Sequence, residues 1–205
     1  MQIVFWLVVT VVGYFLGNIN GALIISRYLM KDDVRTHGSG NAGLTNFFRT
    51  YGGLQSLLVI AIDVAKCVLS CLLAQWLLPS FGLTAKMAAG AVCILGHSYP
   101  VLEGFRGGKG IMSGFAMALA TDWRVALIIL AVFVVVVALT RYVSLGSVLA
   151  AAAFAIGYIA LHWGEWNVCV IAVLTATFVI FRHRQNIGRL LKGTESKLSF
   201  HKKQG

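Results

Sequence analysis

Residues 54–78 read LQSLLVIAIDVAKCVLSCLLAQWLL, an apolar stretch with just two charged side chains, Asp63 and Lys66. A helix needs about 20 predominantly apolar residues to cross a bilayer, so this stretch predicts a transmembrane helix. Asp63 and Lys66 are three positions apart and share one helix face, where opposite charges can pair. Ionisable residues at such a depth usually face the interior of a bundle. We interpret the pair as structural, fixing how this helix packs.

The composition of the whole chain agrees with this interpretation. Of its 205 residues, 59% are hydrophobic and 12% are charged, and the mean hydropathy is +0.83. About a quarter of the residues of a soluble domain are charged, and disordered chains are poor in apolar residues, so both classes are excluded. We predict an all-α, polytopic integral membrane helical bundle in which residues 1–205 form a single domain.

The apolar stretches predict about seven transmembrane helices. The fourth stretch is short, and the count falls to five if the third and fourth stretches form a re-entrant pair. The seven stretches are residues 3–25, 54–78, 84–99, 111–121, 125–139, 144–162 and 166–181.

The basic residues predict the orientation of these helices. With seven crossings, 14 of the 17 Lys and Arg residues lie on one side, Lys86 and Arg124 lie on the other, and Lys66 lies within a span. Basic residues concentrate in cytoplasmic loops, so we expect the amino terminus outside and the carboxyl terminus in the cytoplasm. The formal charge of +10 fits anionic headgroups or an anionic substrate and does not require nucleic acid.

The four cysteines lie within apolar stretches, and two of them, Cys67 and Cys71, are one helical turn apart. The other two, Cys93 and Cys169, add no second pair at metal-ligand spacing. We interpret all four as small packing residues and expect neither a metal site nor a structural disulfide.

Three segments interrupt the apolar pattern with glycine, hydroxyl, amide and basic residues: 33–49, 96–110 and 183–197. All three fall on the cytoplasmic side of the predicted topology. Loops that only connect helices can be short and bland, so the shared composition of these segments is the main indication of function.

The first segment reads DVRTHGSGNAGLTNFFR. We expect Gly38, Gly40 and Gly43 to adopt positive φ, which lets several backbone N–H groups converge on an anion. Arg49 can hold a phosphate through two hydrogen bonds. Further side-chain donors are Ser39, Asn41, Thr45 and Asn46. The alternative is an ordinary flexible loop with turn residues.

The second segment reads GHSYPVLEGFRGGKG. Gly107, Gly108 and Gly110 surround Lys109 directly before an apolar stretch, and backbone donors at a helix N-terminus beside a lysine suit an anion. The spacing is not that of a Walker loop, because no Ser or Thr follows the lysine. An adenine-nucleotide site is therefore disfavoured. The alternative is a tight loop whose lysine extends to the membrane surface.

The third segment reads HRQNIGRLLKGTESK. His183 and Asn186 are three positions apart, so they share a face if the last span continues as a helix. Arg189 continues that face, and we expect Gly193 to end the helix. The alternative is a basic helix that only anchors the chain to lipid headgroups.

Together the three segments resemble the bacterial acyl-phosphate:glycerol-3-phosphate acyltransferase family, whose members do not use coenzyme A. Their order and spacing cover nearly the whole chain. The chain departs from the family pattern at residues 17–20, where Gly-Asn-Ile-Asn stands in place of the usual Gly-Ser-Ile-Pro, and at Ala42 and Leu44. These departures remove no donor and no charge from the segments.

The resemblance implies an enzyme of phospholipid biosynthesis in the bacterial cell (inner) membrane, with several spans and an active site facing the cytoplasm. Its substrates would be an acyl phosphate and glycerol 3-phosphate. The acyl group would pass to the sn-1 hydroxyl, giving lysophosphatidic acid and inorganic phosphate, and no cofactor is implied.

The resemblance also implies roles for individual residues. The loop of Gly107, Gly108 and Lys109 would surround glycerol 3-phosphate, and His183 and Asn186 would orient its hydroxyl. Either His183 or the phosphate of the donor would be the general base. The acyl chain would lie in an apolar groove open to lipid. The implied catalytic residues are Ser39, Arg49, Lys109, His183 and Asn186. The implied substrate-binding residues are Gly38, Gly40, Asn41, Thr45, Asn46, His97, Gly107, Gly108, Gly110 and Arg189. Glu195 is expected to be structural, like Asp63 and Lys66.

A small multi-span transporter of phosphate or another anion is the competing interpretation, because it would also need basic glycine loops. Transporters tend to contain internal repeats that bind their substrate near the midplane of the bilayer. This chain has no evident repeat, and its polar residues gather on one side. The enzyme is therefore favoured.

Overall fold

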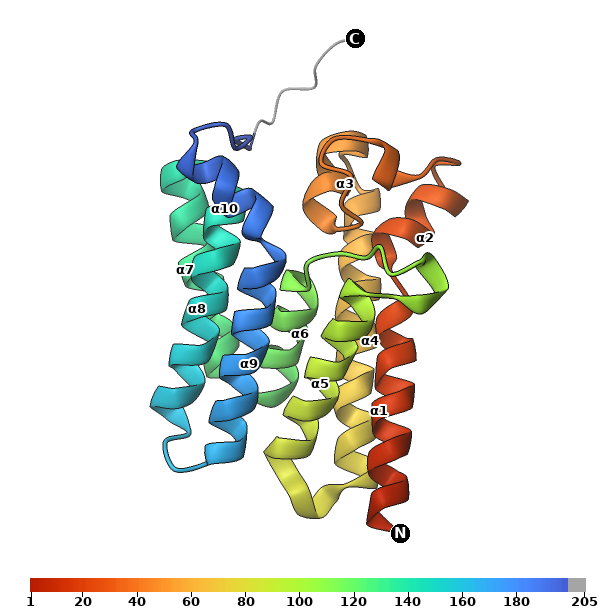
Figure 1. Ribbon diagram of the computed structural model, residues 1–205, viewed down its shortest axis with the longest axis vertical. Helices are drawn as coiled ribbons and strands as arrows, with labels where there is room; N and C mark the ends of the chain where they lie inside the picture. Colours follow the sequence, from red (N-terminus) through yellow and green to blue (C-terminus); the bar gives the residue numbers. More distant parts are fainter. Residues whose placement is uncertain (199–205) are drawn as a thin grey trace.

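The computed structural model describes residues 1–198, which form an all-helical bundle with no strand in that range (Figure 1). The prediction of an all-α helical bundle is thereby confirmed. The helices are α1 (Gln2–Asn18), α2 (Gly21–Tyr28), α3 (Leu44–Tyr51), α4 (Gln55–Leu77), α5 (Gly82–Ser98), α6 (Ile111–Thr121), α7 (Trp123–Thr140), α8 (Val143–Leu161), α9 (Trp166–Arg182) and α10 (Arg184–Leu191). Three short 3₁₀ segments join them, η1 (Val34–Thr36), η2 (Pro79–Phe81) and η3 (Val101–Glu103).

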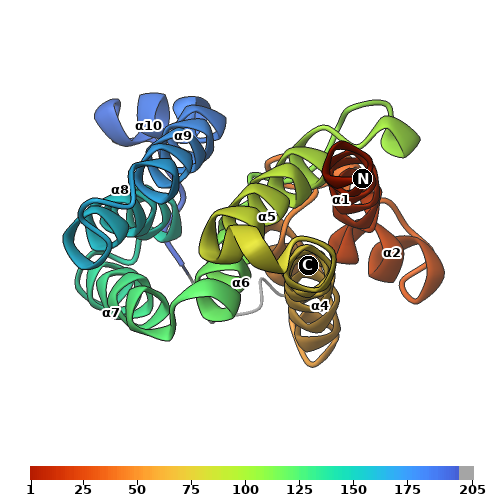
Figure 2. The same cartoon turned by 90° about the horizontal axis from the view of Figure 1, so that it is seen from below.

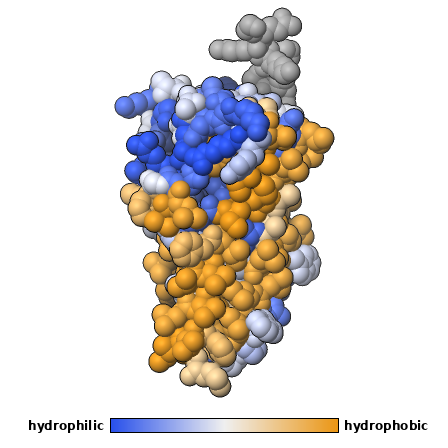
Figure 3. Space-filling view, turned by 90° about the vertical axis from the view of Figure 1, so that its right-hand side faces the viewer, coloured by the Kyte–Doolittle hydropathy of each residue, from blue (hydrophilic) through white to orange (hydrophobic). Residues whose placement is uncertain are grey.

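The long helices run up and down along one axis, so the three polar segments meet at one end of the bundle (Figure 1). The amino terminus lies at the opposite end. We call the end that holds residues 33–49, 96–110 and 183–197 the polar end. Figure 3 shows a hydrophilic cap there above an apolar flank. Two of the basic residues assigned to the cytoplasmic side, Lys202 and Lys203, lie outside the described residues.

Each of the seven predicted stretches contains a helix. By length and composition, four spans can cross a membrane: α4, α7, α8 and the run from η2 to η3 that contains α5. The pairs α1 with α2 and α9 with α10 bring the number to six if each bent pair counts as one span. Helix α6 has 11 residues, fewer than a helix needs to cross a full hydrocarbon core. The count of seven and the orientation remain predictions.

The first predicted span is not one continuous helix. It breaks between α1 and α2, which meet at an angle of 41°. The Asn20 side chain accepts a hydrogen bond from the Leu23 N–H and so caps the start of α2, while the Gly21 N–H donates to Asp63 on α4 at 3.2 Å. Asparagine at an N-cap favours a new helix start, which apolar periodicity alone does not reveal.

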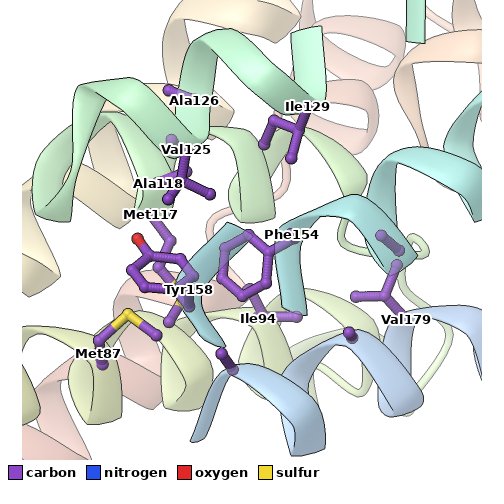
Figure 4. Close-up of a cluster of buried hydrophobic side chains, with 14 of the residues drawn as sticks. Met87, Ile94, Met117, Ala118, Val125, Ala126, Ile129, Phe154, Tyr158 and Val179 are labelled. Atoms are coloured by element: carbon purple, nitrogen blue, oxygen red, sulfur yellow. The ribbon is translucent and has the colours of Figure 1, made fainter. Parts of the chain in front are cut away.

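The core of the bundle lies around α6, which sits between α4 and α5 on one side and α7 and α8 on the other (Figure 2). Buried side chains from these helices and α9 pack there, among them Met117, Phe154 and Tyr158 (Figure 4). The outward faces remain apolar: Leu139 is 80% exposed and Trp76 is 77% exposed. Such a surface suits lipid, not water.

Glycine brings α1 and α5 into backbone contact. A Cβ on Gly96 would lie far inside the contact distance of the Tyr14 carbonyl oxygen, and one on Gly17 would do the same at the Cys93 carbonyl oxygen. Small residues at helix crossings allow this close approach in membrane proteins. The α1–α5 crossing is therefore specified by residues with no side chain at all.

We expect Gly96→Ala to destabilise the protein by about 3 kcal/mol, at the upper end of the usual cost of overpacking, because the added methyl must push two helix backbones apart. Gly188→Ala is the matched control, since nothing lies within 4 Å of a Cβ there. Thermal unfolding in detergent measures both variants. A melting temperature of Gly96→Ala equal to that of the control would contradict this account of the crossing.

Candidate active site

A cavity of about 160 Å³ lies at the polar end, and its walls come from all three polar segments together with α4, α6, α7 and α8. We call it the polar cavity. It brings together twelve of the predicted site residues: Ser39, Asn41, Thr45, Asn46, Arg49, Asp63, His97, Lys109, Gly110, His183, Asn186 and Glu195. The other predicted residues, Gly38, Gly40, Lys66, Gly107, Gly108 and Arg189, do not line it.

The first segment is shaped by the amide of Asn46. Its Nδ2 donates to the carbonyls of Val34 and His37 at 2.9 and 3.0 Å, and its Oδ1 accepts from the Ser39 N–H at 2.9 Å. Both N–H donors of Asn46 are thus used within the loop. The structure gives this residue a loop-forming role, and Ser39 is held at the cavity wall.

The glycines of this segment differ in backbone conformation. Gly38 and Gly40 have φ of 55° and 68°, the left-handed region predicted for them. The same prediction is wrong for Gly43, whose φ is −145°. Gly43 caps the start of α3 in an extended conformation, and a Cβ there would lie 2.7 Å from Asn41 Nδ2, so space and not φ favours glycine.

Arg49 lies on α3 and joins the first segment to the third. Its Nη2 donates to the Ser196 carbonyl at 2.9 Å, which leaves other guanidinium N–H groups for a ligand. Thr45 precedes it by one helical turn on the same face and also lines the cavity. The two side chains form one wall with Ser39 and Asn41.

Gly107 and Gly108 pack against His97 at the end of α5. A Cβ on either residue would overlap His97, the Gly108 N–H donates to the His97 carbonyl at 3.1 Å, and Arg182 donates to the Gly108 carbonyl at 3.0 Å. Neither glycine has positive φ. Their small size lets the loop close on His97, and their role in substrate binding stays a prediction. Of the three glycines around Lys109, Gly110, with φ of 87°, is the one that lines the cavity.

Lys109 follows Gly107 and Gly108 and lies among several arginine side chains. Burial, together with the nearby guanidinium groups of Arg189, Arg182 and Arg49, lowers the pKa of Lys109 to about 8 against the opposing effect of Glu195. No carboxylate forms an ion pair with Lys109 within residues 1–198. A bound anion would relieve both effects, so the site is electrostatically suited to a phosphate.

His183 occupies the 58° bend between α9 and α10. Its Nδ1 lies 2.8 Å from the Val179 carbonyl oxygen, which can only accept, so Nδ1 carries the proton and Nε2 presents a lone pair. Asn186, three residues on, donates through Nδ2 to Glu195 at 2.8 Å. Its buried Oδ1 has no hydrogen-bond partner in the described part of the chain.

Glu195 holds the third segment together. Besides Asn186 it accepts from Arg189 Nε at 2.6 Å, the pairing that its structural interpretation expects. Gly193 adopts φ of 69° just after α10, where it ends the helix. Arg189 is therefore turned toward Glu195 and not into the cavity.

Two further hollows adjoin the polar cavity. An apolar groove of about 160 Å³ between α6, α7, α8 and α9 shares Gly110, Ile111, Met112 and Phe133 with it. An outer basic pocket of about 380 Å³ shares Ser39, Asn41 and Lys109 with it. The cations of this pocket are Arg35, Arg106, Lys109, Arg182, Arg184 and Arg189. The cavity is thus continuous with an apolar surface on one side and a basic surface on the other.

Comparison with known protein sequences identifies the family. The sequence profile of the Glycerol-3-phosphate acyltransferase family matches residues 7–193. The chain belongs to this family. It is 41% identical over 188 residues to the glycerol-3-phosphate acyltransferase of Thermoanaerobacter pseudethanolicus, covering 92% of this chain and 93% of that one. It is 38% identical over 198 residues to that of Finegoldia magna, covering 97% and 98%.

Comparison with solved structures finds the same family, and the matching structures are of an integral membrane protein. The crystal structure of PlsY (YgiH), an integral membrane glycerol 3-phosphate acyltransferase, in its glycerol 3-phosphate form has a TM-score of 0.87 at 34% identity, over 95% of this chain and 96% of that chain. Its lysophosphatidic acid form has a TM-score of 0.83 at 34% identity, over 95% of each chain. This glycerol-3-phosphate acyltransferase family member is therefore an integral membrane protein.

The sequence did not indicate every residue that lines the cavity of this acyltransferase. Ser144 and Ser147, on the first turns of α8, also line it, and the buried Ser144 hydroxyl has no partner within the described range. In the sequence both serines lie at the start of an apolar stretch, where nothing distinguishes them as site residues. Asn20, one of the departures from the family pattern, donates to the Ala42 carbonyl at 3.0 Å and so supports the first segment.

The depressed pKa of Lys109, about 8, predicts the pH dependence of this acyltransferase. We expect the charged form of Lys109 to bind the substrate phosphate, and kcat/KM reports the free enzyme, so kcat/KM for glycerol 3-phosphate should fall as pH rises through about 8. In Lys109→Arg the fall should disappear from the measured range, because a guanidinium does not deprotonate there. An unchanged fall in Lys109→Arg would contradict the assignment.

Proposed function

We propose that this protein transfers a fatty acyl group from an acyl phosphate to the sn-1 hydroxyl of glycerol 3-phosphate, giving lysophosphatidic acid and inorganic phosphate. One observation carries the proposal: a cationic cavity lies between an apolar groove in the flank of the bundle and a basic pocket at the polar end. An amphipathic donor and a soluble phosphate acceptor need this arrangement. Family membership favours the enzyme over an anion transporter.

The three hollows suggest where each part of the substrates lies. The acyl chain occupies the apolar groove, and the phosphate of the donor lies in the polar cavity against Ser39, Asn41 and Arg49. Glycerol 3-phosphate arrives through the outer basic pocket and reaches Lys109, which belongs to both hollows. The cavity lies at the polar end, so the orientation predicted from the basic residues puts the reaction at the cytoplasmic face of a bacterial inner membrane.

The chemistry is an acyl transfer between two oxygen atoms. The sn-1 oxygen forms a bond to the carbonyl carbon, the bond from that carbon to the phosphate oxygen breaks, and the hydroxyl proton ends on the released phosphate. Nε2 of His183 accepts a hydrogen bond from the hydroxyl and so orients the hydroxyl. This role is the same whether His183 or the donor phosphate takes the proton first. The anhydride carries the free energy of the reaction, so the step needs no cofactor.

Arg49 and Lys109 stabilise charge during this step. Negative charge develops on the carbonyl oxygen and moves onto the leaving phosphate, and fixed cations in a partly buried site stabilise such charge strongly. They also hold two phosphate-bearing molecules close together, which replaces an encounter in solution by a reaction between neighbours. Binding and charge stabilisation thus use the same groups.

Donor specificity tests the proposal. Purified protein with palmitoyl phosphate and labelled glycerol 3-phosphate should form lysophosphatidic acid, whereas palmitoyl-CoA should give no product above background, because the cavity near Ser39 and Arg49 fits a phosphate leaving group. Arg49→Ala, assayed with palmitoyl phosphate, serves as the inactive reference and should lose about 10²–10³-fold in kcat. A comparable rate from palmitoyl-CoA would contradict the proposed donor.

A further inference from the structure

Lys66 is a buried ammonium with a complete set of partners. Its side chain is 2% exposed, and its Nζ lies 2.7 Å from Asp63 Oδ1, 2.8 Å from the Ile19 carbonyl oxygen and 2.8 Å from His97 Nδ1. An ammonium has three N–H donors and accepts nothing. His97 Nδ1 must therefore be an acceptor, which puts the single proton of a neutral imidazole on Nε2.

His97 connects this buried group to the active site. Its side chain lines the polar cavity, its carbonyl accepts the Gly108 N–H at 3.1 Å, and a Cβ on Gly108 would overlap its Nε2. The loop that ends in Lys109 thus rests on the His97 ring. A rotation of that ring would displace the loop.

We infer that Lys66 is a positioning residue of the active site: it fixes His97 as the Nε2–H tautomer, supports the Gly107–Lys109 loop through it, and makes His97 a hydrogen-bond donor to a substrate oxyanion. Asp63 assists by holding the Lys66 ammonium. The inference goes beyond a structural ion pair, and it rests on the proposed function only for its kinetic readout.

The second histidine of the cavity supports this inference by its contrast. His183 carries its proton on Nδ1, toward the Val179 carbonyl, so its Nε2 accepts. His97 and His183 therefore offer one donor and one acceptor to the same cavity, which suits an acceptor molecule with an anionic phosphate and a neutral hydroxyl. A pair that only held helices together could be replaced by apolar residues at little cost and would not need an imidazole from the cavity wall as its third partner.

The first test reads the tautomer directly in the unmodified protein. Nitrogen-15 imidazole spectra of the wild-type protein in detergent, with the His97 signals assigned by their loss in His97→Gln, should show a neutral ring protonated at Nε2. A ring protonated at Nδ1, or at both nitrogens, would overturn the inference. This test does not depend on activity, so its outcome is separate from that of the proposed function.

The second test separates positioning from packing by kinetics. The double variant Asp63→Asn/Lys66→Met removes both charges together, so that neither is left buried alone. We expect kcat/KM for glycerol 3-phosphate to fall about 10²-fold, as displaced catalytic groups usually cause, with elution in gel filtration unchanged. In a His97→Gln background the same double change should add almost nothing, because coupled residues are not additive.

Asp122→Asn is the matched control. It removes a buried carboxylate that contacts His162 at 2.9 Å near the end of the bundle opposite the polar end, and it should lower the melting temperature without changing kcat/KM. A folded Asp63→Asn/Lys66→Met protein with kcat/KM within twofold of wild type would overturn the inference. So would a loss that multiplies independently in the His97→Gln background.

Discussion

The buried ammonium of Lys66 ties together the helices that surround the polar cavity. A charge inside a bilayer protein is costly unless it is paired and fully hydrogen-bonded, and its three partners belong to three parts of the chain: α4 through Asp63, the α1–α2 break through Ile19, and the end of α5 through His97. Satisfying this group fixes where α2 begins and where the second polar segment starts. Three elements that are far apart in the sequence are thereby brought to one point beside the cavity.

Much of this arrangement follows from the sequence. The length of each apolar stretch and the alternation of apolar stretches with polar segments can be recognised without knowing how the side chains pack. The apolar stretches predict the helices, and the shared side of segments 33–49, 96–110 and 183–197 predicts that they meet. The pairing of Asp63 with Lys66 follows from their spacing. The sequence could not reveal that Lys66 also reaches His97, because that contact joins two helices whose relative rotation is set by packing.

Other features were missed for equally physical reasons. A glycine in a polar loop can serve positive φ or close packing, and the sequence does not distinguish them: Gly38 and Gly40 use the first, whereas Gly107 and Gly108 use the second. Ser144 looks like one more residue of an apolar span until the fold turns it into the cavity. The short length of α6 is visible in the sequence, but its place at the junction of the apolar groove and the polar cavity is not.

In the proposed reaction the polar cavity and the apolar groove act as one site for an amphipathic donor. An unreactive acyl phosphonate with a diazirine in mid-chain, photolysed on the purified protein and mapped by mass spectrometry, tests it most directly. We expect labels on the walls of the apolar groove, at Phe115, Leu130 or Phe154. Labels confined to the other apolar hollow, between α5 and α9 at Ala88, Leu95 or Leu174, would contradict it.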